Sequence, residues 1–285
     1  EVRMPATPST VMSNALTEAP RPVLHLSGQK LRASLEALVA GCEEQGGIER
    51  YIDALKLKTR VFQQVLHDRD LNTLERGELA ALCAFMPTVR RRVANEFDRE
   101  GLDRLRHAIA LLLAGSDNGG TADDRLQAFI AQYPSGREYR WVKDLAAELL
   151  HQYDIERYPL MCRWVWDTKA NTGALREIWH GDDVDSRTLD VADDYAMHLM
   201  LREELSVYLS DNGFYRDIAQ VVDLLLAQIY AEYICAQGGT YLRTDFSSPE
   251  DPMQHTRRML GLDGIKSGSS KLRLKTVDGE AFEVD

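Results

Sequence analysis

Two pairs of residues in the chain share the spacing Glu-x-x-His: Glu148 with His151, and Glu177 with His180. Helical bundles that hold two iron or manganese ions use a glutamate and a histidine one turn apart on each of two helices. The spacings therefore raise the hypothesis of a di-iron or other divalent metal site formed by these four side chains. The bridging carboxylates that such a site needs from other helices cannot be identified in the sequence.

The helix predicted over residues 137–153 argues against this metal site. Its apolar stripe is centred between Leu145 and Leu149. At about 100° per residue, Glu148 then falls on the flank of that stripe and His151 nearly opposite it. We therefore expect His151 to face solvent.

The second pair has the same problem. A helix over residues 174–180 turns Glu177 and His180 away from its apolar residues, and a strand would place the two side chains on opposite faces. We expect all four residues of the two pairs to be surface residues, and we predict no cofactor.

Acidic residues gather after the second pair, around the predicted start of the next long helix. They are Asp182, Asp183, Asp185, Asp190, Asp193 and Asp194. Clustered carboxylates can hold magnesium against a diphosphate in all-helical enzymes, but the spacing departs from the usual Asp-Asp-x-x-Asp. The alternative is that these acids stabilise the N-terminus of the helix predicted over residues 189–210 through its dipole.

All four tryptophans lie between Trp141 and Trp179. Aromatic side chains usually fill a core, but tryptophan and arginine also line pockets and interfaces. We therefore place the candidate function in residues 158–183, with the loop 237–246 as the next choice. The candidate binding residues are Arg163, Trp164, Trp166, Lys169, Arg176, Trp179 and His180.

Linear signatures of common enzyme classes do not occur in the chain: it has no phosphate-binding loop, dinucleotide-binding glycine triplet, HExxH or nucleophile elbow. Our first hypothesis is a non-catalytic helical protein that acts through protein contacts, as an adaptor, assembly factor or scaffold; a homodimer is one such arrangement. The alternative is a helical enzyme, or a cofactor- or metal-binding protein, with a pocket at residues 141–183.

The net charge of −11 should repel nucleic acid and anionic membranes, so we expect neither as a partner. A local exception would be Arg90, Arg91 and Arg92, but acidic residues follow them closely, which is typical of a solvated face. The four cysteines form no Cys-x-x-Cys pair, which suits reduced thiols and a cytoplasmic protein.

Apolar residues recur every three or four positions from about Ser27 onward, which predicts an all-α fold. We expect a bundle of about ten to twelve helices, including helices over 49–67, 75–85, 88–98, 101–114 and 214–236. The helices could form two packed subdomains. The expected divisions are a disordered leader (1–22), an N-terminal subdomain (23–114), a C-terminal subdomain (121–262), and a linker with a tail (263–285).

Two segments depart from this helical pattern. Residues 161–179 fit either helices joined by a turn or a two-strand hairpin around Asn171. Near the C-terminus, alternating apolar residues flank Asp278-Gly279, which predicts a short β-hairpin.

Overall fold

The computed structural model describes residues 23–115, 121–238, 251, 253–266, 272–275 and 281–284. Within these ranges the protein is mostly helical, which confirms the predicted all-α fold. The described residues form ten α-helices: α1 (Gly28–Glu44), α2 (Ile48–Leu66), α3 (Arg76–Ala84), α4 (Arg99–Leu113), α5 (Ala122–Ile130), α6 (Trp141–Tyr153), α7 (Ala174–Glu177), α8 (Tyr195–Asp211), α9 (Ile218–Gly238) and α10 (Gln254–Met259).

Several of these helices begin at the side-chain caps that the sequence contains. Ser27 accepts the backbone N–H of Lys30 at the start of α1, and Thr121 forms a capping box with Asp124 at the start of α5. Such caps satisfy N–H groups that have no partner inside the helix. They fix where the helices begin.

The helix predicted over residues 88–98 is wrong. This segment is a series of turns with a short 3-10 helix, Val93–Glu96. Val89, Val93 and Phe97 are buried at a four-residue spacing, which imitates a helix. The chain is extended at Asp98, whose side chain caps α4, so a helix could not continue through this point.

Two predicted helix starts also need correction. Helix α8 begins at Tyr195 rather than near residue 189, and α9 begins at Ile218 rather than at 214. Asp194 caps α8 by accepting the backbone N–H of Met197. The acidic residues before Asp194 therefore lie in the loop that precedes the helix.

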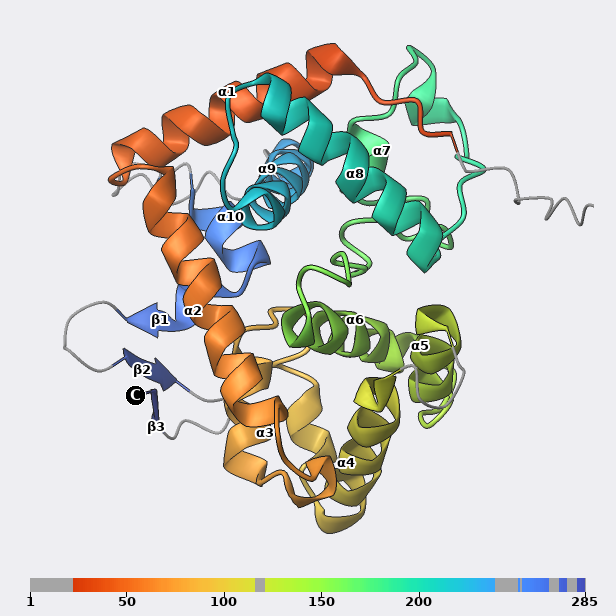
Figure 1. Ribbon diagram of the computed structural model, residues 1–285. Helices are drawn as coiled ribbons and strands as arrows, with labels where there is room; N and C mark the ends of the chain where they lie inside the picture. The colour runs from red at the N-terminus through yellow and green to blue at the C-terminus, as the bar shows by residue number, and fades with distance from the viewer. Residues whose placement is uncertain are drawn as a thin grey trace, which may run out of the picture.

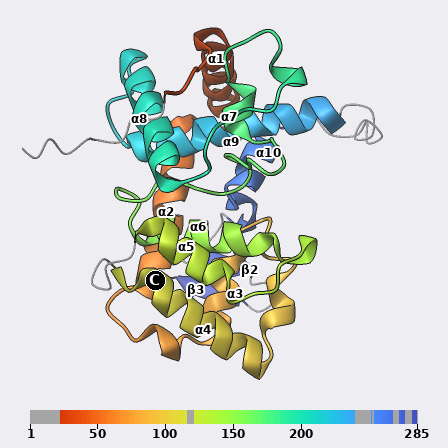
Figure 2. The ribbon, with the colours of Figure 1, turned by 90° about the vertical axis from the view of Figure 1, so that its right-hand side faces the viewer.

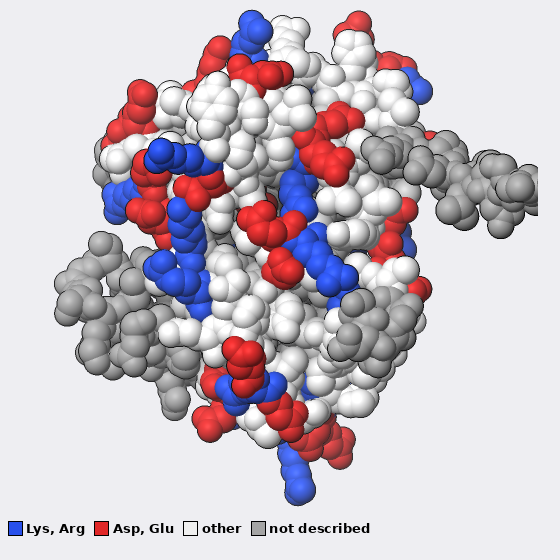
Figure 3. Space-filling model, viewed as in Figure 1, with Lys and Arg blue, Asp and Glu red and all other residues white. Residues whose placement is uncertain are grey.

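The helices are arranged in two tiers (Figures 1 and 2). Helices α1, α8, α9 and α10 lie together in one tier, α3 to α6 form the other, and the long helix α2 runs through both. One buried apolar cluster extends from Leu24 to Leu262. On the face shown in Figure 3, basic side chains lie beside acidic ones.

Helix α9 is the most apolar helix of the tier that contains α1, α8 and α10. Its residues Ile218–Gln237 are long and apolar enough to cross a membrane by length and composition, a test that the core helix of a water-soluble protein also passes. In this protein 61% of the most apolar stretch of α9 is buried by other elements. The helix packs against α1, α7, α8 and α10.

The segment over residues 161–179 combines features of the two forms that the sequence allowed. Asp167 and Thr172 form an isolated antiparallel bridge, and the one-turn helix α7 follows at Ala174. Gly173 joins them with a φ of 133°, where a side chain would be strained. The result is a tight turn that packs α7 against the chain that precedes it.

Three short strands follow α10: β1 (Ile265–Lys266), β2 (Leu272–Lys275) and β3 (Ala281–Val284). They are drawn as an antiparallel sheet in the order β1-β2-β3. The turn at Asp278-Gly279 lies outside the described residues, so the C-terminal hairpin stays a prediction. The leader over residues 1–22 and most of the loop 237–246 also lie outside them, and the expected divisions of the chain remain predictions.

Candidate functional site

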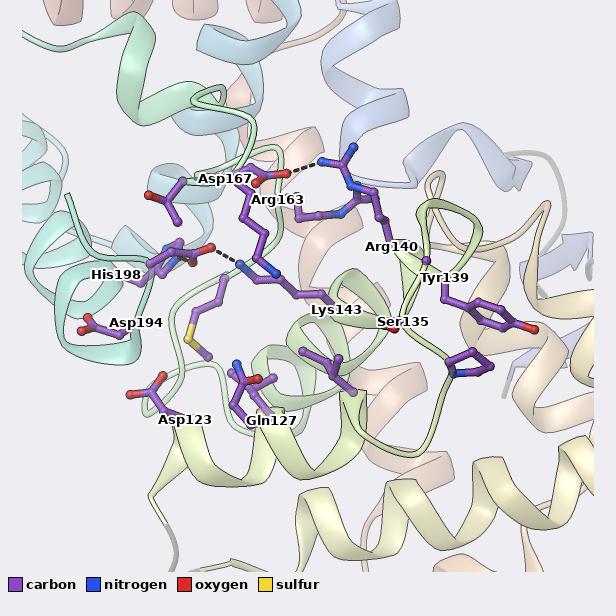
Figure 4. A pocket seen from close by; sticks show the side chains of 18 residues that line it. Asp123, Gln127, Ser135, Tyr139, Arg140, Lys143, Arg163, Asp167, Asp194 and His198 are labelled. Carbon is purple, nitrogen blue, oxygen red and sulfur yellow. Dashed lines mark hydrogen bonds and ion pairs between the residues drawn. The ribbon is translucent and has the colours of Figure 1, made fainter. Parts of the chain in front are cut away.

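A pocket of about 390 Å³ opens where α5, α6, the chain over residues 161–169 and the start of α8 meet (Figure 4). Its apolar wall includes Leu126, Ile130 and Met161. Eight charged side chains line the rest of it, four of each sign. They are Arg140, Lys143, Arg163, Lys169, Asp123, Asp167, Asp193 and Asp194.

Helix α6 places two of the basic groups. Arg140 directly precedes the helix and donates from Nη2 to Oδ2 of Asp167 at 2.7 Å. Lys143, one turn further along, forms an ion pair with Asp193 from the loop before α8. These two ion pairs tie the pocket's walls together across elements that are distant in sequence.

Arg163 is held from behind by a buried carboxylate. The backbone N–H of Arg163 donates to Asp144 Oδ1 at 2.8 Å, and its Nε and Nη2 donate to Oδ2 at 3.2 and 2.7 Å. Asp144 is only 2% exposed. Two bonds from the guanidinium and one from the backbone to the same buried carboxylate fix the position of Arg163, because a charged hydrogen bond is stronger than a neutral one.

Two acids meet at the start of α8. Asp194 is the N-cap of the helix, and Asp123 from α5 accepts the backbone N–H of Tyr195 at 2.9 Å. Burial raises the pKa of Asp123, and the charge of Asp194 raises it further. Within the described ranges neither carboxylate forms an ion pair with a lysine or arginine.

His198 joins the pocket from the first turn of α8. Its Nε2 donates to Asp193 Oδ1 at 3.1 Å, and its buried Nδ1 has no hydrogen-bond partner among the described residues. Burial lowers the pKa of His198 and outweighs the opposite effect of Asp193. The imidazole is therefore neutral, with its proton on Nε2.

Of the predicted binding residues, Arg163 and Lys169 line this pocket and the others do not. Trp164 and Trp166 are buried in the core. Arg176 donates to the carbonyls of Arg187 and Val184, so it supports the loop before α8. Trp179 is half-buried and His180 is exposed. The tryptophans thus fill space rather than enclose it.

The expectation that Glu148 and His151 face solvent is wrong. Glu148 is 6% exposed and His151 1% exposed. Helix α6 packs against α2, α4 and α5, so its polar residues are buried as well as its apolar stripe. A helical-wheel prediction that assumes one solvent-exposed face does not apply to a helix that other helices surround.

The structure does not assemble the hypothetical metal site. Glu148 forms an ion pair with Lys58, while His151 bonds through both ring nitrogens, Nδ1 to the carbonyl of Tyr158 at 2.8 Å and Nε2 to Asp223 at 2.9 Å. Glu177 is half-buried and burial raises its pKa. Among the described residues no three histidine, cysteine, aspartate or glutamate side chains gather within reach of one ion.

The arginine cluster at residues 90–92 has a local partner. Arg90 forms two hydrogen bonds with Asp263, at 2.9 and 2.8 Å. The bond joins the turns after α3 to the segment after α10. This guanidinium therefore holds two parts of the protein together.

Sequence reasoning missed Asp123, Arg140, Lys143 and His198 as parts of a site. They lie on three separate stretches of chain, at the starts of α5, α6 and α8, and no short motif links them. The one usable signal was the run of acids before α8, which indicated a helix start, placed about six residues too early, but not a cavity. No protein-family model matches the chain, and neither curated proteins nor solved structures include a match.

Proposed function

We propose that the protein binds a small polar molecule in the pocket between α5, α6 and α8. The observation that carries the proposal is a cavity of about 390 Å³ whose charged lining is held by cross-element bonds. Ligand pockets in proteins span about 300–1,000 Å³ and combine apolar walls with a few fixed polar groups. The cavity fits this description.

The side chains favour binding over nucleophilic catalysis. A serine or threonine nucleophile needs a base within hydrogen-bond reach. Thr168 donates to the carbonyl of Val191, and Ser135 lies at the opposite end of the pocket from His198 (Figure 4). The Nε2 of His198 is engaged by Asp193. No hydroxyl of the lining contacts the imidazole in the part of the chain described.

A melting-temperature screen tests the proposal. The probes are millimolar amino acids, amines, carboxylic acids, sugars and nucleobases. A ligand at a hundredfold excess over its Kd stabilises a protein by about 2.7 kcal/mol, which raises the melting temperature by several degrees. We expect at least one probe class to do so.

The screen needs a variant that fills the pocket. Ile130 lines the cavity and is half-buried, so Ile130→Trp should abolish the rise in melting temperature that the ligand causes. Val207 on α8 is 63% exposed and away from the lining, so Val207→Trp should keep it. A screen in which no probe stabilises the protein, or in which the Ile130→Trp protein responds equally, overturns the proposal.

The first hypothesis from the sequence, a scaffold acting through protein contacts, remains the second proposal. The large apolar side chains exposed among the described residues are Val23, Leu111, Val207 and Tyr215, which lie on separate elements. We carry the cytoplasmic location, the C-terminal hairpin and a protein partner or homodimer forward with this second proposal. Its test is the mass of the purified protein in solution, where a monomer throughout would remove the homodimer.

A further inference from the structure

The pocket's charges indicate which class of small molecule it takes, an inference that rests on the proposed function. The positive side is a pair of guanidinium groups. Arg140 uses one nitrogen on Asp167, and Arg163 uses two on Asp144. A guanidinium has five N–H donors, so each group keeps donors free while its carboxylate holds it in place. Guanidinium groups held in this way can bind an acid group with the donors that remain.

The negative side is the pair Asp123 and Asp194. Each carboxylate spends one oxygen, Oδ1, on a backbone N–H at the start of α8. The start of a helix carries about half a positive charge, which cannot balance two carboxylates. Among the described residues the other acids of the lining, Asp167 and Asp193, do have basic partners. The pair therefore lacks a cation.

The two sides occupy different parts of one cavity. Figure 4 shows Asp123, Asp194 and His198 at one end, with Arg140, Tyr139 and Ser135 toward the other. The neutral imidazole of His198 adds no positive charge to the acidic end. Leu126, Ile130 and Met161 supply an apolar surface in the same pocket.

We propose that the ligand is dipolar: an amine that binds Asp123 and Asp194, joined by a short hydrocarbon segment to an acid group that binds Arg140 and Arg163. This arrangement places each ligand charge against the side chains that lack an opposite charge or keep free donors. The apolar wall then contacts the hydrocarbon. Molecules of the amino-acid type fit this description.

Calorimetric titration with matched probes tests the inference. The probes are ω-amino acids of increasing chain length, and the n-alkylamines and alkanoates of the same lengths. We expect the best amino acid to bind about tenfold or more tightly than its amine and its acid, a difference of about 1.4 kcal/mol. Equal affinities for an amino acid and one of its half-molecules would overturn the inference.

Variants assign each end of the ligand. Asp123→Asn should weaken the binding of the amino acid and of the amine but leave the affinity for the alkanoate unchanged. Arg140→Gln should weaken the binding of the amino acid and of the alkanoate but leave the affinity for the amine unchanged. Asp190→Asn and Arg137→Gln are matched controls, because both residues are exposed and neither lines the pocket. An Asp123→Asn protein with undiminished amine affinity contradicts the assignment.

The two proposals fail in different ways. If none of these probes binds while another class still stabilises the protein in a pocket-dependent manner, the dipolar ligand is wrong and the proposed binding function stands. If no probe of any class depends on the pocket, the binding function is wrong as well.

Discussion

At the scale of single residues, the two buried histidines differ in charge because their partners differ. Both ring nitrogens of His151 face acceptors, the Tyr158 carbonyl and the Asp223 carboxylate, so both must carry protons. Burial alone would lower the pKa of His151, but Asp223 and Glu148 outweigh it and raise the pKa above its ordinary value. His198 has one acceptor and a lowered pKa, so it stays neutral.

This difference predicts opposite effects of pH on stability. A histidine titrates near pH 6.5 in the unfolded chain. The contribution of His151 to the free energy of unfolding is fully present below about pH 6.5. It is lost as the pH rises through the higher pKa that His151 has in the folded protein. The contribution of His198 changes the other way: it is present above about pH 6.5 and is lost as pH falls through its lower folded pKa.

Urea unfolding of His151→Gln and His198→Gln at several pH values measures the effect. The difference in free energy of unfolding between the wild type and His151→Gln should become smaller as the pH rises above about 6.5. The difference between the wild type and His198→Gln should become smaller as the pH falls below about 6.5. Nitrogen NMR of the histidines provides an independent reading. A pKa of His151 at or below its ordinary value of about 6.5 in the folded protein would contradict the assignment.

At the scale of elements, the sequence predicted the amphipathic helices, which have one buried and one solvent-exposed face. Helices α1, α2 and α4 lie close to their expected positions because their apolar residues recur on one side. Helix α6 also lies where expected, but its buried polar residues Asp144, Glu148 and His151 could not be recognised. Their partners come from α2, α9 and the segment after α6, and such long-range contacts leave no local pattern.

The candidate site was predictable only in part for the same reason. Residues 158–183 contain Arg163 and Lys169, which do line the pocket. The same segment also supplies Met161, Asp167 and Thr168, which were not predicted. The rest of the lining comes from α5, α6, α8 and the loops before α6 and α8, which meet only through the fold. The cluster of tryptophans directed the prediction to a segment that overlaps the pocket, but Trp164 and Trp166 themselves belong to the core.

The turn before α7 yields a prediction about one glycine. A Cβ at Gly173 would lie 2.6 Å from the carbonyl oxygen of Val165, and its φ of 133° is unfavourable for any side chain. Gly173→Ala should therefore cost more than the roughly 1–3 kcal/mol of backbone strain alone. Because the turn carries Lys169, ligand affinity should fall with stability.

Gly213 is the matched control for this substitution. It also has a positive φ, of 93°, but a Cβ there meets nothing within 4 Å. Gly213→Ala should show the strain without the clash, as measured by chemical unfolding. Equal losses for the two variants would show that the contact with Val165 does not limit the turn.

At the scale of the whole molecule, the two tiers share buried contacts. Lys58 on α2 is 2% exposed and pairs with Glu148 on α6. The same ammonium donates to the carbonyl of Leu260 after α10 at 2.9 Å and to that of Phe85 after α3 at 3.4 Å. One charge thus connects four elements drawn from both tiers in Figure 1.

These shared contacts predict that the tiers unfold together. Tryptophan fluorescence reports residues 141–179, while far-ultraviolet circular dichroism reports all the helices. Since the buried cluster is continuous, both signals should change at one temperature. Removing one partner of a buried ion pair costs about 3–5 kcal/mol, so Lys58→Met should lower both midpoints by the same amount. Separate midpoints, or a variant that shifts one signal alone, would mean that α2 does not couple the tiers.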